Sequence, residues 1–229
     1  MNLHTVTVAS TAAPAEGLTL LELTAGDWSG SHERPGQYLM FQAPFDDKPR
    51  PIAIASAPGR DPVALLLKAE RDRQDALRAL SPGDTVSCSS PAGPGFPVDQ
   101  LGDELPGEAL ILVATGTALA PIKTCLDVLI AKGRLPPATS LYVGARREAD
   151  LAFPEELSRY RQAGVTVETI FSQPEANTNA GHVQALLTQP PSSPRTSVVF
   201  SCGQPQMMQE VEDIMAGFDV PRPHMFRNF

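Results

Sequence analysis

The rhythm of the chain changes once, close to Pro106-Gly107, and this change limits the folds that the sequence can adopt. From residue 109 onward, apolar strand segments alternate with segments of helical spacing, beginning with the continuous apolar run 109–115, ALILVAT. A strand followed by a helix, repeated several times, predicts a parallel sheet with helices on both of its faces. The expected strands are 109–115, 140–143, 165–171 and 197–201, and the expected helices are 121–132, 154–163, 183–187 and 206–215.

The first half of the chain has a different pattern, in which short β-type runs are separated by turn formers such as Pro58-Gly59 and Pro82-Gly83. Six short strands at this spacing predict a small antiparallel barrel, with a helical insert at 73–80. The expected strands are 5–10, 18–24, 36–43, 51–57, 63–69 and 84–89. Since 229 residues suffice for two domains, we expect a β-barrel over 1–105 and an α/β domain over 106–229.

Composition excludes several classes of partner. The 18 Lys and Arg residues are outnumbered by 26 Asp and Glu, and no run of five or six like charges occurs, so we expect no nucleic-acid partner. The apolar runs stop far short of the ~20 residues that a membrane span needs. The first residues lack the basic and apolar stretches of a secretory signal, so we expect a cytoplasmic protein.

The three cysteines, Cys88, Cys125 and Cys202, contain no C-x-x-C pair. Their number and spacing exclude a disulfide framework, a cysteine-ligated zinc site and a four-cysteine iron–sulfur cluster within this chain. We therefore expect no metal site.

Glycine-containing segments follow the strands of the second half. The segment 116–121, GTALAP, leaves an apolar strand and opens a helix, where free backbone N–H groups can hold a pyrophosphate. An ordinary strand-to-helix turn is an equally good interpretation of this segment alone, because Ala118 and Pro121 occupy the later glycine positions of G-x-G-x-x-G. Segments 141–146, 171–173, 181–184 and 201–208 also lie at strand ends, where open α/β sheets bind ligands.

Eight segments, in order along the chain, resemble those of the ferredoxin–NADP reductase-like superfamily, including its compact fruit-protein-like subgroup. They are 35–38 (PGQY), 50–56 (RPIAIAS), 80–86 (LSPGDTV), 91–96 (PAGPGF), 116–121 (GTALAP), 142–146 (YVGAR), 181–184 (GHVQ) and 202–208 (CGQPQMM). The resemblance implies a flavin-binding barrel followed by an NAD(P)-binding domain. It also implies an NAD(P)H-dependent oxidoreductase that passes hydride to FAD, or to FMN, and electrons to an unidentified protein or small-molecule acceptor.

The same resemblance implies roles for individual residues. Cys202 is expected near the reacting nicotinamide carbon, and Phe229 is expected to stack on the flavin ring, with a strand-end anchor as its alternative role. The residues expected at the flavin are Tyr38, Arg50, Pro51, Ile52, Ala53, Ile54, Lys68, Arg71 and Gly93. Those expected at the nicotinamide nucleotide are Gly116, Thr117, Ala118, Gly144, Arg146, Ser172, Gly203 and Met207.

Two departures from the family pattern concern the flavin. Ile52 and Ala53 replace a tyrosine and a serine, and a G-x-x-S segment that holds flavin phosphate aligns with 71–74, RDRQ. Arg71 and Arg73 are candidate replacements as charged phosphate partners. These losses leave a second hypothesis, a flavin-weakened or flavin-free descendant that binds a nucleotide or a partner without turnover.

The choice between NADH and NADPH depends on the end of the third strand of the second half. Ser172-Gln173 stands where NADPH-preferring reductases often have Ser-Arg, and Gln173 supplies no charge. This favours NADH slightly, although Arg146 and Arg147 are possible substitutes, so the nucleotide is expected to be NAD(P)H.

Overall fold

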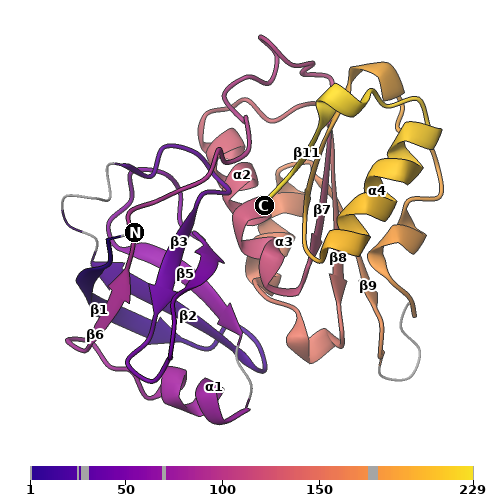
Figure 1. The fold of residues 1–229 in the computed structure, drawn as a ribbon. Coiled ribbons are helices and arrows are strands. Elements are labelled where there is room, and N and C mark those ends of the chain that lie inside the picture. The colour runs from indigo at the N-terminus through magenta and orange to yellow at the C-terminus, as the bar shows by residue number, and fades with distance from the viewer. Residues whose placement is uncertain (1, 25, 27–30, 69–70, 175–179, 229) are drawn as a thin grey trace.

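The computed structural model describes residues 2–24, 26, 31–68, 71–174 and 180–228, with only the backbone of residues 71 and 72. Two sheets lie side by side (Figure 1), and each is built from one half of the sequence. The six-stranded antiparallel sheet and the five-stranded parallel sheet confirm the predicted fold class. The last strand of the first sheet ends at Cys88 and the first strand of the second begins at Ala109. The predicted division at 105/106 falls in this connection.

The first sheet has the order β4-β3-β6-β1-β2-β5 and closes into a barrel. Closure is made by a bridge between Ile54 and Leu65, next to which the Ala55 N–H donates to the Ala64 carbonyl at 2.7 Å. The strands are β1 (His4–Ala12), β2 (Leu18–Thr24), β3 (Tyr38–Gln42), β4 (Arg50–Ala53), β5 (Val63–Lys68) and β6 (Thr85–Cys88).

Alternating side chains fill the barrel, as the period of two in a strand requires. Leu21 and Leu23 of β2 and Leu65 of β5 are fully buried inside it. Helix α1 (Arg71–Arg78) lies at one end of the barrel (Figure 1), where it buries Leu77 in the same core. The side chain of Gln74 donates to the Thr19 hydroxyl at 2.6 Å and ties this helix to β2.

The second sheet is parallel and has the order β11-β10-β7-β8-β9. The chain runs from β7 outward to β9 and then returns to β10 on the other side of β7, so the strand order reverses between β7 and β10. The strands are β7 (Ala109–Thr115), β8 (Ala138–Ala145), β9 (Thr166–Phe171), β10 (Ser197–Cys202) and β11 (Met225–Arg227). Ligands of open α/β sheets bind at the carboxyl ends of the strands beside such a switch point.

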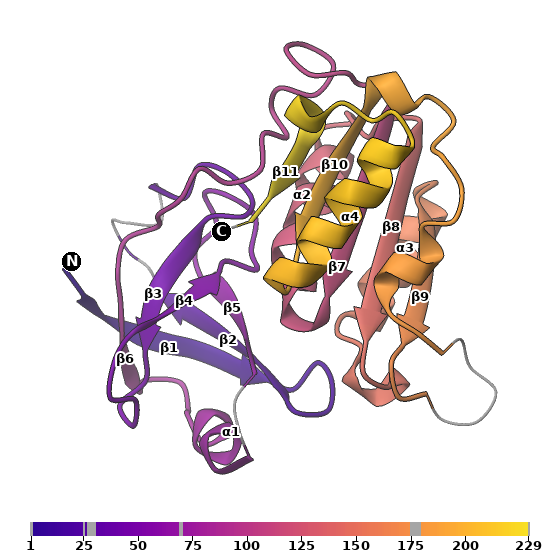
Figure 2. The same ribbon diagram turned by 45° about the vertical axis from the view of Figure 1, so that its right-hand side comes forward.

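Helices cover both faces of the parallel sheet. Leu110 and Leu112 of β7 pack with α2 (Leu119–Ala131) and α3 (Pro154–Gln162) on one face. Ile111 and Val113 pack with α4 (Pro205–Gly217). Helix α4 covers the other face of the sheet (Figure 2). Because β7 is buried on both faces, its sequence is continuously apolar, which is why its bounds could be predicted correctly.

Several observed elements differ from the predicted bounds by a few residues, and the predicted helix 183–187 is the 3₁₀ turn η4 (Val183–Leu186). Strand β11 was not expected, because three residues are too short for a recognisable period, and it forms only by pairing with β10. Helix α2 begins at Leu119 and not at 121, after the 3₁₀ turn η2 (Gly116–Ala118). Pro121 is tolerated because it lies in the first turn, where a backbone N–H has no intrahelical acceptor.

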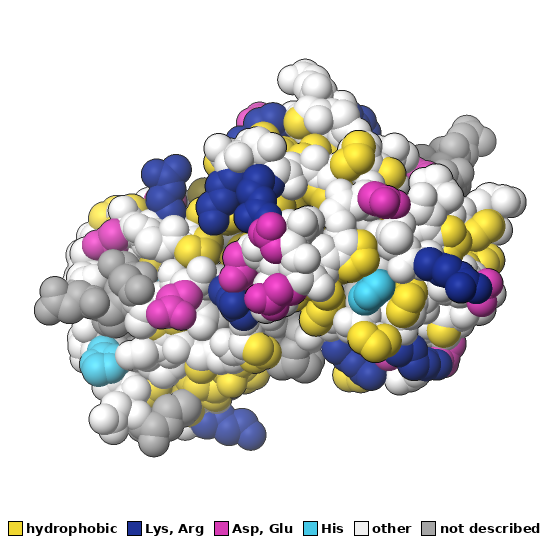
Figure 3. Space-filling model, turned by 90° about the horizontal axis from the view of Figure 1, so that it is seen from above, with side chains coloured by type: hydrophobic (Ala, Val, Ile, Leu, Met, Phe, Trp, Pro, Cys, Tyr) yellow, Lys and Arg dark blue, Asp and Glu magenta, His cyan; other side chains and the backbone are white. Residues whose placement is uncertain are grey.

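One of the buried apolar clusters contains residues of both halves. Leu18 and Leu66 of the barrel belong to the same buried cluster as Leu119 of α2, and Phe96 stacks on Phe200 with 4.9 Å between ring centroids. On the face shown in Figure 3, basic and acidic side chains are interspersed. Within the described part of the chain, no helix combines the length and apolar character that crossing a membrane requires.

Candidate functional site

A cleft of about 610 Å³ lies where the barrel meets the switch point of the parallel sheet, and we call it the switch-point cleft. Strands β4 and β5 form its barrel wall, and the ends of β7 and β10 form the opposite wall. Its lining comprises Pro51, Ile52, Ala53, Leu66, Lys68, Thr115, Gly116, Thr117, Ala118, Cys202, Gly203, Gln204, Pro205 and Asn228. The structure therefore brings together residues that are about 150 positions apart in the sequence.

The turn after β7 gives the cleft a wall of backbone groups. Gly116 has a φ of +57°, a left-handed conformation that glycine adopts without strain, and it turns the chain from β7 directly into η2 and α2. The first turn contains no acidic residue. Helix N-termini present free N–H groups and a positive partial charge, so this wall suits an anionic group such as a pyrophosphate.

Cys202 and Gly203 close the cleft at the end of β10. Burial raises the pKa of the Cys202 thiol to about 12, although a hydrogen bond with Asn228 favours the thiolate, so the thiol is neutral at physiological pH. A Cβ atom on Gly203 would overlap Met207 Cε and Thr115 Oγ1, so only glycine fits here without a shift of its neighbours. The neutral thiol can pack against a ligand but is not an activated nucleophile.

The barrel wall is mainly apolar. Pro51, Ile52, Ala53 and Leu66 present no side-chain hydroxyl to the cleft, and Lys68 adds an exposed ammonium group at its edge. This wall can pack against a flat aromatic ring, and its polar contacts to a ligand have to come from backbone groups or from Lys68.

A second cleft of about 390 Å³ continues from the first along the ends of β8 and β9, and we call it the strand-end cleft. The two clefts share Thr115, Gly116 and Gln204. Its other lining residues are Gly144, Ala145, Arg146, Ser172, Gly181, His182, Val183, Gln184, Gln206, Met207 and Glu210. All the residues that the sequence assigned to the nucleotide therefore line one continuous pair of clefts.

Two charged side chains of the strand-end cleft, Arg146 and Glu210, have polar or charged partners nearby. Arg146 Nε donates to Asp150 at 3.0 Å, and Arg147 contacts Asp150 at 2.8 Å and Glu16 at 3.2 Å. Burial opposes ionisation of Asp150, but the hydrogen bonds from both arginines outweigh it and hold the pKa of that carboxyl below its ordinary value. Two amides, those of Gln206 and Gln184, donate to Glu210 and lower its pKa in the same way, so the cleft also carries a negative charge.

Several predicted flavin residues lie outside both clefts. Tyr38 stands opposite Ala53 in the barrel ladder but lines a separate hollow, with its ring against Gly93. Ile54 is fully buried in the barrel core and its N–H donates to the Gln37 carbonyl, so neither its side chain nor its N–H is free to meet a ligand. Arg50 precedes the cleft lining and contacts Asp46 at 3.5 Å.

Two predicted residues fall outside the described part of the chain: Phe229, and the side chain of Arg71. Their expected roles therefore stay predictions. Among the described residues, no group of three or more His, Cys, Asp and Glu side chains could hold a metal ion.

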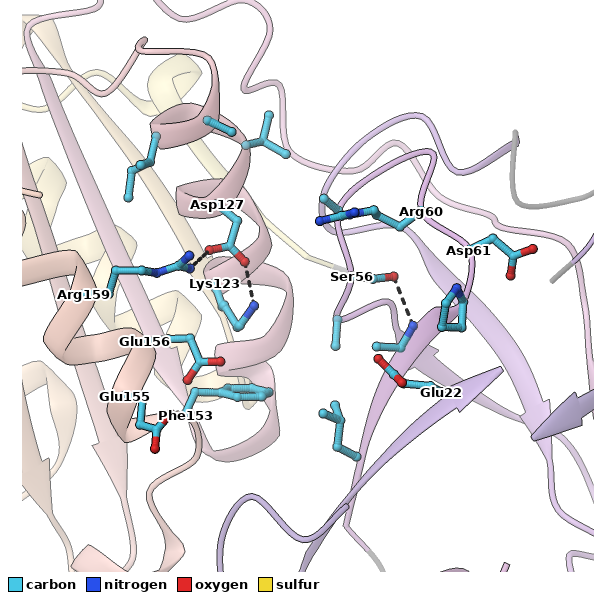
Figure 4. Close-up of a pocket in the computed structure, with 18 of the residues that line it drawn as sticks. Glu22, Ser56, Arg60, Asp61, Lys123, Asp127, Phe153, Glu155, Glu156 and Arg159 are labelled. Atoms are coloured by element: carbon cyan, nitrogen blue, oxygen red, sulfur yellow. Dashed lines mark hydrogen bonds and ion pairs between the residues drawn. The ribbon is translucent and has the colours of Figure 1, made fainter. Parts of the chain in front are cut away.

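A further cleft, of about 920 Å³ and larger than the two above, lies between the barrel and the helices α2 and α3 (Figure 4). Its central acid, Asp127, is contacted by Lys123 at 2.6 Å and Arg159 at 2.5 Å, and it accepts a hydrogen bond from Tyr160. Of the predicted site residues that the structure describes, none lines this cleft. Its size alone does not make it the functional site, and its two cations nearest Asp127, Lys123 and Arg159, are already paired with that acid.

Sequence reasoning missed some of the residues that line the two functional clefts. Asn228 reaches the switch-point cleft because β11 is parallel to β10, and the Asn228 N–H donates to the Ser201 carbonyl at 3.1 Å. Leu66 of β5 lines the switch-point cleft, and Glu210 of α4 lines the strand-end cleft. The order of the strands, which single-sequence patterns do not contain, is the signal that would have found them.

Comparisons with known proteins agree with this geometry. A family model described as the oxidoreductase NAD-binding domain matches residues 112–213, the segment that supplies both clefts with their nucleotide-side walls. The chain is 26% identical over 200 residues to sulfhydrogenase 1 subunit gamma of Pyrococcus furiosus, covering 84% of this chain and 66% of that protein. It is 26% identical over 205 residues to fruit protein pKIWI502 of Actinidia deliciosa, covering 82% and 63%.

Similarity to a solved structure agrees with these sequence comparisons. The ferredoxin-NADP+ reductase of Plasmodium falciparum superposes with a TM-score of 0.77 at 15% identity, covering 99% of this chain and 95% of that one. Residues 112–213 match the oxidoreductase NAD-binding domain family, and the whole chain has the fold of the ferredoxin–NADP+ reductases. The chain spans 66% and 63% of the lengths of the two relatives named above.

Proposed function

We propose that this protein is an NAD(P)H-dependent flavoprotein oxidoreductase that takes hydride from the nicotinamide to FAD and passes electrons to an acceptor. The observation that carries the proposal is the switch-point cleft, in which an apolar barrel strand faces the ends of β7 and β10. When bound, the nicotinamide and the flavin supply the hydride chemistry themselves, so the chain has to bind, align and enclose them.

The residues present fit a flavin. Pro51, Ile52, Ala53 and Leu66 offer an apolar wall for the ring, and Lys68 lies at the edge of that wall. Arg50 makes one ion-pair contact among the described residues, at 3.5 Å, and its side chain is 37% exposed, so N–H groups of its guanidinium remain for a phosphate. FMN is the alternative flavin, since the ring and the first phosphate are common to both.

On the nucleotide side, the turn Gly116–Ala118 would hold the pyrophosphate with backbone N–H groups, and Cys202 and Gly203 would pack against the nicotinamide. The strand-end cleft would hold the adenosine half. Because Asp150 neutralises Arg146 and Glu210 adds a negative charge, the cleft favours NADH over NADPH.

The acceptor is a partner protein or a small molecule. One relative is named as a subunit of a larger enzyme, which supports a protein acceptor for this chain as well. The lack of hydroxyl groups on β4 supports one further candidate, a flavin-weakened or flavin-free descendant that binds a nucleotide or partner without turnover.

The visible spectrum of the freshly purified protein tests the proposal. We expect flavin absorption bands that bleach when NADH is added under nitrogen. A colourless protein that takes up neither FAD nor FMN, and that oxidises neither NADH nor NADPH, would show that the non-catalytic candidate is correct.

A further inference from the structure

Asp46, in the connection between β3 and β4, is a carboxylate held rigidly in a buried position. Its side chain is 1% exposed. The Ala43 N–H donates to its Oδ2 at 3.1 Å, and the Asp46 N–H donates back to the Ala43 carbonyl at 3.0 Å. A buried carboxylate is costly unless charged donors surround it, so its partners are part of the fold.

Two guanidinium groups meet at its other oxygen, Oδ1. Arg73 Nη1 donates to it at 2.8 Å, and Arg50 Nη2 lies 3.5 Å away. The arginine side chains are 41% and 37% exposed, in contrast to the buried acid between them. The highly exposed carboxylate of Asp47 lies 3.8 Å from Arg73 Nη2, so the four charged groups sum to zero, and both guanidinium groups still face solvent in part.

Both arginines of this cluster are close in sequence to residues that line the switch-point cleft. Arg50 directly precedes Pro51, which lines that cleft, and Arg73 belongs to the first turn of α1, shortly after Lys68, which lines it too. The segment that contains Arg73 is also the one that lacks the glycine and serine expected to hold flavin phosphate.

Arg50 has N–H groups that its contact with Asp46 does not use. A guanidinium group has five N–H bonds. Arg50 uses at most one in its contact with Asp46, and its Nε has no acceptor among the described residues. Guanidinium groups bind phosphate oxygens through paired N–H···O contacts, which are stronger when the side chain is already oriented.

We propose that Arg50 and Arg73, positioned by Asp46, form a two-arginine clamp for the phosphate of a flavin nucleotide. The clamp replaces the glycine and serine donors that this chain lacks at 71–74. Asp46 is a positioning residue, because it acts on the ligand only through the arginines. This inference rests on the proposed function, and it names the residues by which the chain retains a flavin despite its altered sequence.

The competing interpretation of the same contacts is that the Asp46 carboxylate takes the place of the phosphate and keeps flavin nucleotides out. The two interpretations predict opposite effects when the negative charge is removed. In the clamp, Asp46→Asn loosens both arginines and weakens binding; in the competing case, it vacates the position and strengthens binding.

The test measures dissociation constants of FAD, FMN and riboflavin for the flavin-stripped full chain, by quenching of flavin fluorescence. Arg73→Ala should weaken FAD and FMN roughly ten-fold or more, the loss expected for a charged hydrogen bond, and leave riboflavin unchanged because it has no phosphate. Arg78→Ala, which removes the same charge from an exposed position on the same helix, should change none of the three.

Asp46→Asn should weaken FAD and FMN by roughly three-fold or more, with circular dichroism to show that the variant is folded. Tighter FAD binding by this variant, or equal loss for riboflavin in Arg73→Ala, would overturn the clamp while leaving flavin binding intact. If the unaltered chain binds none of the three flavins, the proposed function fails as well, so the two failures are distinguishable. Because Arg73 is partly exposed, its substitution tests the clamp even if Asp46→Asn does not fold.

Discussion

Arg146 donates through Nε to the carboxylate of Asp150 at 3.0 Å, and this ion pair neutralises a basic residue that lines the strand-end cleft. Arg147 contacts the same acid at 2.8 Å, so one carboxylate holds two arginines. The residues that could have met the 2′-phosphate of NADPH are thus already engaged. Under the proposed function, nucleotide preference therefore depends on an acid that does not itself line the cleft.

Substitution Asp150→Asn should release the charge of Arg146 and improve NADPH binding. We expect the dissociation constant of NADPH to fall roughly three- to ten-fold, as about 1 kcal/mol of surface electrostatics allows, while that of NADH changes little. Isothermal titration with both nucleotides measures this. Glu155→Gln is the matched control, since Glu155 is an exposed acid of α3 that lines the cleft of Figure 4 and not the strand-end cleft. Equal changes for both nucleotides would contradict the role given to Asp150.

Substitution Gly203→Ala should narrow the switch-point cleft. The added Cβ would overlap Thr115 Oγ1 and Met207 Cε, so we expect a loss of about 1–2 kcal/mol of unfolding free energy and weaker nucleotide binding. Urea denaturation and nucleotide titration measure the two effects. Gly217→Ala is the control, because nothing lies within 4 Å of its Cβ and alanine favours the end of helix α4. Unchanged stability in Gly203→Ala would mean that the neighbours move freely.

The sequence predicted the architecture well where burial decides the pattern. Strand β7 is apolar throughout because both faces are covered, and β2 shows the alternation of a strand whose inward residues fill a barrel. The position of Gly116 and Cys202 at one site could also be predicted, since parallel strands bring their carboxyl ends to the same edge of the sheet.

The features that could not be predicted depend on how the strands and helices pack in three dimensions. Tyr38 and Ala53 are paired across the barrel, yet only Ala53 reaches the switch-point cleft. The contact of Arg73 with Asp46 joins residues 27 positions apart and depends on where α1 packs. Local spacing does not show which strand residue will meet the second domain, and it does not show which distant residues will form an ion pair.

The three cysteines should be unreactive in the folded protein. Burial raises the pKa of Cys88 and of Cys202 to about 12, and raises that of Cys125 well above its ordinary value, so all three are neutral thiols at pH 8. Because the thiolate is the reactive form, we expect almost no release of chromophore from Ellman's reagent until guanidinium unfolds the chain, and then three equivalents. One thiol that reacts rapidly in the native protein would contradict this expectation and show that a cysteine is accessible and activated.

His32 should make the folded state sensitive to mild acid. Burial lowers the pKa of His32 to about 4 from 6.5, against the opposing effect of its hydrogen bond with the Arg34 carbonyl at 3.1 Å. The unfolded chain therefore binds a proton that the folded chain refuses. The stability that the neutral ring contributes is present above pH 6.5 and is lost as the pH falls toward 4.

Between pH 6.5 and pH 5, before most carboxylates titrate, we expect urea denaturation to show a loss of about 2 kcal/mol in the free energy of unfolding. His32→Gln should flatten this dependence, whereas His182→Gln, at an exposed position, should retain it. The same slope in all three proteins would mean that other groups cause the acid sensitivity.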